Sequence, residues 1–190
     1  MSGRSFNIFK DIHVCPWWFS FFLDNLLRPR FHDPEKILSP YVKEGYVAAD
    51  IGCGPGYFSP TMARLVGESG RVVCIDLQRK MLDRARWNAE RAGMANRMEF
   101  RQCSSDSLML SEKLDFALTF WMVHEVPDSE SFFRQIYDAL KPGGRYLLVE
   151  PKMHVTRAKF ERQCAIAGAV GFVPAGDPMV SLSRGMVFGK

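Results

Sequence analysis

Three glycines and an acid near residue 50 have the spacing best suited to ligand binding in this chain. The segment from residue 47 to residue 60 reads VAADIGCGPGYFSP, in which Asp50 comes near the end of an apolar run and Gly52, Gly54 and Gly56 follow it. Glycines let a backbone approach a ligand closely because no Cβ stands in the way. The segment therefore predicts a ligand site just after a strand.

The glycine pattern fits neither of two common phosphate sites. The dinucleotide pattern GxGxxG requires a third glycine where this chain has Tyr57, and Gly56 comes one residue early. A P-loop requires GK[ST], which does not follow. A carboxylate at Asp50 would also repel a pyrophosphate held at a helix N-terminus. An acid there favours a ligand with a positive group.

A second acid, Asp76, ends the next apolar run, VVCID. An acid roughly 20 residues beyond a glycine loop, at the tip of the next strand, is placed to accept hydrogen bonds from both hydroxyls of a ribose. Together the two acids favour a nucleoside with a cationic substituent and no phosphate. S-adenosylmethionine fits this description, since it joins adenosine to a sulfonium and an ammonium group.

The elements that must position these acids alternate along the chain. Helical periodicity and β-rich composition separate them into two sets. Strands are expected at residues 46–51, 71–77, 98–103, 114–120 and 145–150, and helices at 57–66, 78–92, 129–141 and 156–169. Two further strands are expected from residue 172 and over 185–188. This alternation predicts parallel strands with helices on both faces and ligands at the carboxyl ends of the strands.

Two helix ends carry specific signals. Asp128 is the expected N-cap of the helix over 129–141, and Pro142, Gly143 and Gly144 are expected to end it. Gly93 is expected to end the helix over 78–92. The expected strands over 98–103 and 145–150 therefore each follow a defined helix end.

Composition narrows the class of protein. A chain of 190 residues with 47% hydrophobic residues suits one buried core and one domain. Its net charge of +4 is scattered, which gives no nucleic-acid signal. The five cysteines are odd in number and form no CxxC pair, so we expect no disulfide framework, no metal site and a cytoplasmic location. No stretch approaches the length of a membrane span.

Five segments in order resemble the class I S-adenosylmethionine-dependent methyltransferases. They read VAADIGCGPGYFS, VVCIDLQRKML, MEFRQCSSDSL, LDFALTFWMVHEVPD and ALKPGGRYLLVEP. The resemblance runs from about residue 34 to the end. It implies an α/β fold of Rossmann-like type, a three-layer sandwich whose seven-stranded sheet is mostly parallel with an antiparallel C-terminal strand. It also implies S-adenosyl-L-methionine as cofactor and S-adenosyl-L-homocysteine as product.

The resemblance implies a cofactor role for each matching position. Asp50 and the glycine loop would lie at the methionine part, Asp76 would bind the ribose, and the serines after the third strand would face the adenine edge. The implied set is Asp50, Gly52, Cys53, Gly54, Gly56, Asp76, Leu77, Met81, Ser104, Ser105, Phe120 and Trp121. Taken alone, Cys53 is a small loop residue and Met81 a core residue. Many relatives have an acid at the position of Ser104, whereas this chain has Asp106 two residues later.

Candidate catalytic residues follow the fourth strand. Methyl transfer mainly requires alignment of the acceptor, so a strong catalytic group is optional. His124 and Glu125 could deprotonate an acceptor hydroxyl, amine or thiol. A histidine here could equally be a packing residue. Glu150, at the end of the fifth strand, is another candidate.

The chain divides into residues 1–33, an N-terminal aromatic extension or lid, and residues 34–190, the methyltransferase domain. The extension contains CPWWFSFFL. Three interpretations remain open for it: a helix docked for stability, a lid whose aromatic rings attract the sulfonium, or a membrane-surface or dimer contact with Arg28 and Arg30 at its rim.

A small-molecule methyl acceptor is favoured because no appended recognition module is evident, and we expect a monomer or a homodimer. Two alternatives are a nicotinamide-dependent oxidoreductase, which Tyr57 argues against, and a non-catalytic module that binds the cofactor. The sequence does not identify the acceptor.

Overall fold

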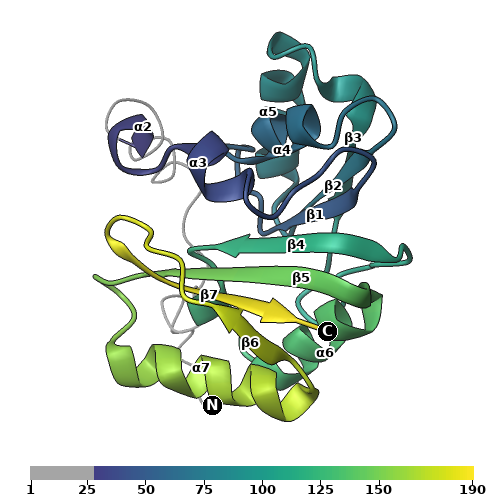
Figure 1. Ribbon diagram of the computed structural model, residues 1–190. Helices are drawn as coiled ribbons and strands as arrows, with labels where there is room; N and C mark the ends of the chain where they lie inside the picture. The colour runs from purple at the N-terminus through teal and green to yellow at the C-terminus, as the bar shows by residue number, and fades with distance from the viewer. Residues whose placement is uncertain (1–27) are drawn as a thin grey trace, which may run out of the picture.

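The computed structural model describes residues 28–190, which form one seven-stranded sheet between two layers of helices (Figure 1). The strand order is β3-β2-β1-β4-β5-β7-β6, and only β7 runs antiparallel to its two neighbours. The strands are β1 (Val47–Ile51), β2 (Arg71–Asp76), β3 (Met98–Gln102), β4 (Leu114–Phe120), β5 (Leu140–Pro151), β6 (Val173–Gly176) and β7 (Ser183–Gly189). The predicted fold class, with its antiparallel C-terminal strand, is confirmed.

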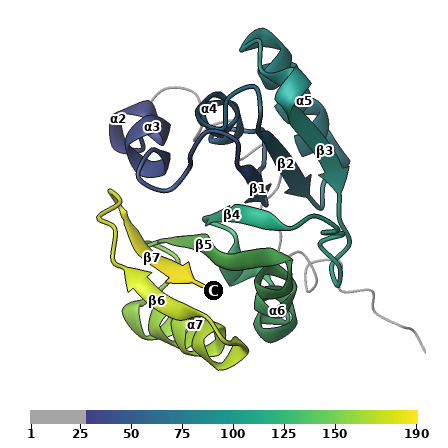
Figure 2. The ribbon, with the colours of Figure 1, turned by 45° about the vertical axis from the view of Figure 1, so that its right-hand side comes forward.

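The helices cover the two faces of the sheet. In Figures 1 and 2, α4 and α5 lie on one side of the sheet, and α6 and α7 lie on the other. The helices are α2 (Arg28–Phe31), α3 (Pro34–Leu38), α4 (Ser59–Leu65), α5 (Arg79–Arg91), α6 (Ser129–Ala139) and α7 (Arg157–Val170), with 3₁₀ turns η1 (Ala95–Arg97) and η2 (Val123–Glu125). The predicted three-layer arrangement follows from these positions.

Alternation within each strand builds two cores. On β4, Phe116 and Leu118 pack with the side chains of α4 and α5, whereas Ala117 belongs to the core under α6 and α7. The side chains of β4 are almost all buried on both faces, which explains why its sequence is a nearly continuous apolar run. The sheet is therefore the wall between two separate hydrophobic clusters.

The caps of α5 and α6 behave as the sequence predicts. The Asp128 side chain accepts a hydrogen bond from the Ser131 N–H at 3.0 Å, so it is the N-cap of α6. Gly93 follows α5 directly and has φ +69°, a left-handed conformation that glycine adopts without strain. Both helix boundaries lie within about a residue of their predicted places.

The start of β5 differs from the prediction. The helix α6 ends at Ala139, and β5 begins at Leu140 rather than at residue 145. Leu140 pairs with Leu114, and the register then shifts before Phe116 meets Arg145. The PGG segment is thus absorbed as an irregularity inside the strand instead of ending a helix, because pairing with β4 satisfies the backbone on both sides of it.

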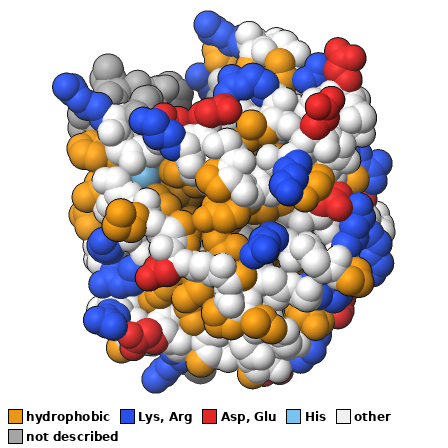
Figure 3. Space-filling view, viewed as in Figure 1, with side chains coloured by type: hydrophobic (Ala, Val, Ile, Leu, Met, Phe, Trp, Pro, Cys, Tyr) orange, Lys and Arg blue, Asp and Glu red, His pale blue; other side chains and the backbone are white. Residues whose placement is uncertain are grey.

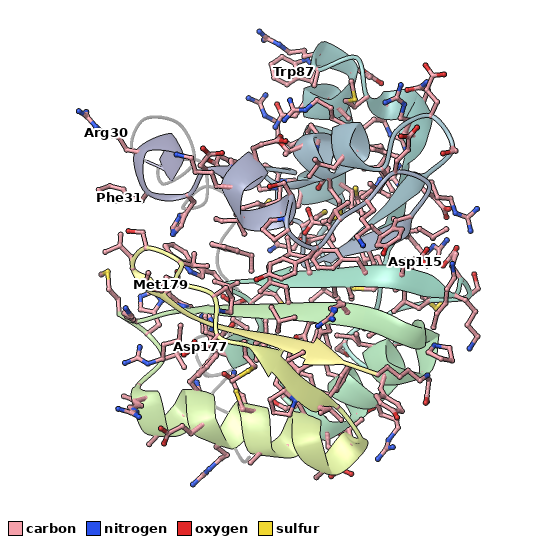
Figure 4. The ribbon with its side chains drawn as sticks, viewed as in Figure 1. Arg30, Phe31, Trp87, Asp115, Asp177 and Met179 are labelled. Carbon is pink, nitrogen blue, oxygen red and sulfur yellow. The ribbon has the colours of Figure 1, made fainter. Side chains whose placement is uncertain are left out.

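The two ends of the sheet have different roles. At the amino end of β4, Asp115 accepts hydrogen bonds from the Val47 N–H at 2.9 Å and the Lys141 ammonium at 2.8 Å, which joins β1, β4 and β5. Figure 4 places Asp115 at one end of the sheet and Phe31 and Met179 at the other. The carboxyl ends of the parallel strands, where a ligand is expected, lie on the side of Phe31 and Met179.

The predicted extension over residues 1–33 falls mostly outside the described residues, which begin at 28. Its described part is α2 and a short linker, after which Asp33 caps α3 by accepting from the Glu35 N–H at 3.0 Å. The boundary at residue 34 stays a prediction. Within residues 28–190, no helix combines the length and the apolar character that crossing a membrane requires.

Candidate functional site

A cavity of about 920 Å³ opens at the carboxyl ends of β1, β2, β3 and β4. Its size is at the upper end of the range of about 300–1,000 Å³ that is usual for small-molecule sites. Every residue predicted to bind the cofactor lines it except Gly56, and both predicted catalytic residues, His124 and Glu125, line it as well. The structure therefore gathers residues from four strand ends into one site.

Each of the three positions in the loop favours glycine for a different structural reason. Gly52 has φ +69°, and a Cβ there would lie 2.7 Å from the Cγ of Met122. Gly54 has φ +54° and donates its N–H to the Asp76 carboxylate at 2.9 Å. A Cβ at Gly56 would lie 3.1 Å from that of Ala85 on α5. Gly56 therefore lets α5 approach the loop, and it is not among the residues that line the cavity.

Asp50 is almost fully buried at the floor of the cavity, 3% exposed, and accepts a hydrogen bond from the Ser59 hydroxyl. Beside it, a hydrogen bond with Cys74 and burial raise the pKa of the Cys53 thiol well above its usual value. Cys53 is therefore a protonated, loop-filling side chain, and the acid beside it supplies the charge of this part of the site.

Asp76 lies at the tip of β2 and is 8% exposed. Its carboxylate accepts from the backbone N–H of Gly54 at 2.9 Å and of Gln78 at 2.8 Å. Burial raises the pKa of this carboxyl, and the backbone hydrogen bonds oppose that rise. The backbone N–H of Leu77 also contributes. A carboxylate has about four acceptor positions, so the group can still accept from a ligand diol.

The loop after β3 carries an acid, Asp106, two residues after the position at which many relatives have one. The Asp106 carboxylate accepts from the Ser104 hydroxyl at 2.6 Å, and this hydrogen bond lowers the pKa of Asp106. Both residues line the cavity together with Ser105. An ionised acceptor is thus present at the edge of the cavity where the family's acid is missing.

Trp121 adopts a backbone conformation that is rare for a bulky residue, with φ +62°. Two hydrogen bonds hold it: its N–H donates to the Val149 carbonyl at 2.8 Å, and its indole N–H donates to the Ser183 hydroxyl at 2.9 Å. Such strain persists only where the surroundings enforce it, and it concentrates at functional sites. The conformation supports a functional role for the end of β4.

His124, on η2, contacts a buried acid. The Nδ1 atom of His124 lies 2.9 Å from Oε2 of Glu150, which is fully buried, while Oε1 of Glu150 accepts from the Val123 N–H at 3.0 Å. Glu125 lies on the same turn, with its Oε1 4.0 Å from Nε2 of His124. Glu150 itself is not among the residues that line the cavity, so it reaches the site only through His124.

The segment before α3 reaches the same site. The His32 ring packs edge-on against Phe120 and Trp121, with ring centroids 5.0 Å apart in each case, and its Nε2 lies 2.8 Å from the Ser181 carbonyl oxygen. The Tyr57 hydroxyl donates to the His32 carbonyl at 2.7 Å. This segment therefore links the N-terminal part of the chain to the end of β4 and to the β6–β7 loop.

Sequence reasoning missed several residues that line the cavity. They come from the segment before α4, from the segments that follow β2, β3 and β4, and from α6. They include Tyr57, Phe58, Gln78, Leu108, Met122, Phe132 and Gln135. Gln135 accepts from the Leu108 N–H at 2.8 Å and donates to the Asp106 carbonyl at 3.1 Å, which joins α6 to the loop after β3. Helical periodicity shows which residues face a core, but it does not show which of them border a cavity.

The comparisons with known proteins agree with this geometry. Residues 42–172 match a family described as "Methyltransferase domain". This chain belongs to that methyltransferase domain family. The predicted class I S-adenosylmethionine-dependent methyltransferase, and the prediction that it is an enzyme, are confirmed at the level of the family.

Two curated relatives show how far the similarity in sequence extends. The chain is 32% identical over 110 residues to "Ubiquinone/menaquinone biosynthesis C-methyltransferase UbiE" of Klebsiella pneumoniae, and 31% identical to the protein of that name from Escherichia coli. In both cases the match covers 57% of this chain and 44% of the relative, so it spans less than half the length of these methyltransferases.

The solved structures show the fold. A SAM-dependent methyltransferase from Aquifex aeolicus has a TM-score of 0.81 and 22% identity, covering 92% of this chain and 98% of that one. A putative S-adenosyl-L-methionine-dependent methyltransferase from Methanococcus maripaludis has a TM-score of 0.76 and 17% identity, covering 99% and 97%. Both similarities in fold extend over more than nine-tenths of this chain.

Proposed function

We propose that this methyltransferase transfers the methyl group of S-adenosyl-L-methionine to a small-molecule acceptor in the cavity at the ends of β1 to β4. The observation that carries the proposal is the placement of two buried carboxylates, Asp50 and Asp76, on either side of the glycine loop. A nucleoside with a cationic tail needs acceptors at both places.

The charge of the cavity supports this cofactor over a dinucleotide. Among residues 28–190, the residues that line the cavity include no lysine and no arginine, while they include Asp50, Asp76 and Asp106. A sulfonium and an ammonium are stabilised by such a lining, whereas the phosphates of a nicotinamide dinucleotide would be repelled. Family membership and this charge together argue against the oxidoreductase alternative.

Each part of the cofactor has residues that fit it. Asp76 would accept hydrogen bonds from the ribose hydroxyls, and Asp106 would accept one from the adenine amino group. The backbone at Gly52 and Gly54 admits the methionine part, and the aromatic faces at Phe120 and Trp121 stabilise an onium charge. When bound, the cofactor supplies an electrophilic methyl group whose bonding pair stays on sulfur. The chain's own residues bind, orient and exclude water.

The relatives support a small acceptor, since they are named for quinone biosynthesis. Because the match spans less than half of their length, their acceptor is not carried over to this chain. Scattered cysteines and charges support a cytoplasmic protein, and a monomer or homodimer remains our proposal for its assembly.

The test is transfer of label from cofactor carrying a tritiated methyl group. The purified full chain is incubated with a panel of phenols, amines, thiols and carboxylic acids, and with bulk protein and RNA. The proposal expects label in one class of small molecule and none in the Asp76→Ala variant. Label only in protein or RNA would contradict the small acceptor. Cofactor binding with no transfer to any acceptor would support the non-catalytic alternative.

A further inference from the structure

The side of the cavity at the end of β4, which we call the acceptor half, is bordered by the pair formed by His124 and Glu150. Both oxygens of Glu150 are occupied, one by the Val123 N–H at 3.0 Å and the other by His124 Nδ1 at 2.9 Å. A backbone N–H is a donor at any pH, so Oε1 must accept. With Glu150 ionised, Oε2 accepts as well, and Nδ1 of His124 then carries the proton.

The tautomer decides what the other ring nitrogen can do. With the proton on Nδ1, Nε2 of a neutral ring carries a lone pair. Nε2 makes no hydrogen bond with any described residue, and the ring lines the cavity with its side chain 15% exposed. The lone pair is therefore available to a molecule in the cavity.

The groups around His124 suit a ring that gains a proton. Glu150 faces Nδ1 from β5, Glu125 lies 4.0 Å from Nε2 on the same turn, and the His154 ring is 5.9 Å away by centroids. Arg184, opposite Glu150 on β7, donates to the Val155 carbonyl at 2.9 Å. The carboxyl groups of Glu150 and Glu125 therefore face the two nitrogens of the His124 ring.

We infer that His124 is the proton acceptor of this site, that Glu150 is its positioning residue, and that the acceptor is an uncharged aromatic molecule with an acidic hydroxyl, such as a phenol. The inference rests on the proposed methyl transfer and names the acceptor class for it. The O–H bond breaks, its proton goes to Nε2, and its electron pair stays on the oxygen, which becomes the nucleophile. The neutral ring becomes an imidazolium balanced by the Glu150 carboxylate.

The lining of this half of the cavity supports an uncharged aromatic acceptor. Beside the acids Glu125 and Asp128, many of its side chains are aromatic or apolar. They come from Tyr57, Phe58, Met122 and Val126, together with Phe120 and Trp121, which also border the proposed cofactor site. Among residues 28–190, no lysine or arginine lines the cavity to pair with a carboxylate or phosphate on the acceptor. The face shown in Figure 3 likewise has its lysines and arginines spread over the surface rather than gathered in one block.

The first test reads the tautomer directly and needs no acceptor. The chain has four histidines, so long-range ¹H–¹⁵N spectra of ¹⁵N-histidine-labelled protein resolve each ring, and His124→Gln assigns the signal. The inference expects His124 with a protonated Nδ1 and an unprotonated Nε2. A proton on Nε2 in the neutral wild-type ring would overturn it.

Glu150→Gln tests the positioning role. In this variant the Val123 N–H donates to the amide oxygen of the glutamine. The NH₂ group then faces Nδ1 as a donor, so the ring proton must move to Nε2. The matched control is Glu161→Gln, an exposed acid that pairs with Arg157 on α7 and leaves the tautomer unchanged. An unchanged tautomer in folded Glu150→Gln would overturn the positioning role. If that variant does not fold, the wild-type spectrum still decides the tautomer.

The acceptor class is tested with two matched molecules, 1-naphthol and 1-hydroxy-2-naphthoate, titrated calorimetrically into the full chain. We expect 1-naphthol to bind at least about tenfold more tightly, equivalent to about 1.4 kcal/mol. Equal or reversed affinities, or no binding of 1-naphthol, would overturn the acceptor class. A parallel titration with S-adenosylhomocysteine separates the two proposals, because its failure contradicts the proposed function while the tautomer result concerns His124 and Glu150 alone.

Discussion

The two halves of the cavity are built in different ways. In the proposed cofactor half, at the ends of β1 and β2, hydrogen bonds join consecutive elements of the chain. Ser59 and Asp50 are 9 residues apart, and Gly54 and Asp76 are 22 apart. In the proposed acceptor half, at the end of β4, the His124–Glu150 contact spans 26 residues and the Trp121–Ser183 bond spans 62. The residues proposed to bind the cofactor are therefore joined across consecutive elements, whereas the wall at the end of β4 also depends on β7, which comes much later in the chain.

The contrast extends to the chemical groups used. The cofactor half relies on backbone N–H groups and buried carboxylates, and its glycines give the ligand access to the main chain. The acceptor half relies on side chains, namely aromatic rings and the His124–Glu150 pair. We expect substitutions to separate accordingly into losses of cofactor affinity and losses of acceptor binding.

The largest effect is expected for Asp76→Ala. It removes both acceptors for the ribose diol, at about 1.5–3 kcal/mol for each charged hydrogen bond, so the affinity for S-adenosylhomocysteine should fall by about 100-fold or more. Isothermal titration calorimetry measures this loss. The control is Asp83→Ala, an exposed acid on α5 that pairs with Arg79. Wild-type affinity in Asp76→Ala would disprove the ribose assignment.

Gly52→Ala should weaken the cofactor half next most strongly. The left-handed backbone costs an alanine about 1–2 kcal/mol, and the contact with Met122 adds about 1–3 kcal/mol. We expect a lower free energy of unfolding together with a loss of cofactor affinity. Gly93→Ala is the matched control, since Gly93 also has φ +69° but has nothing within 4 Å of its Cβ. Equal effects of the two substitutions on affinity would show that the loop at Gly52 tolerates a side chain.

Acid should weaken cofactor binding through Asp76. Because its pKa is raised by burial, the carboxylate is lost at a higher pH than an ordinary aspartate, so affinity is complete above that pKa and falls as the pH drops through it. Titrations of S-adenosylhomocysteine across this range should show a decline of up to about tenfold per pH unit. In Asp76→Asn the decline should disappear, and its persistence there would assign it to another group.

The smallest effect tests the acceptor half. Ser183→Ala removes the acceptor of the Trp121 indole N–H and should lower the free energy of unfolding by about 1 kcal/mol. Affinity for S-adenosylhomocysteine should stay within about threefold of wild type, whereas 1-naphthol should bind more weakly. Denaturant unfolding and calorimetry measure the two quantities. A large loss of cofactor affinity would show that the halves are coupled.

The sequence predicted the cofactor half well because its signals are local. Alternating strand and helix patterns gave the sheet, and Asp50, Asp76 and two of the three glycines line the cavity as expected. The third, Gly56, does not line the cavity, and a Cβ there would meet Ala85 on α5. The start of β5 was also wrong, because strand pairing at Leu140 outweighs the PGG stop signal.

The acceptor half could not be predicted in the same way. Glu150 was a catalytic candidate by its position at a strand end, but only the fold shows that it lies behind His124. No local pattern joins His32 to Trp121, and none shows that Gln135 on α6 borders the cavity. These contacts arise from packing between elements that are remote in the chain.

Calorimetric titration of the full chain with S-adenosylmethionine, S-adenosylhomocysteine and NAD⁺ tests the central claim most directly. The claim is that the loop at Gly52 and its two buried acids hold a cationic nucleoside without phosphate. The account predicts that both sulfur nucleosides bind one per chain and that NAD⁺ gives no heat of binding. Binding of NAD⁺ without binding of either sulfur nucleoside would contradict it.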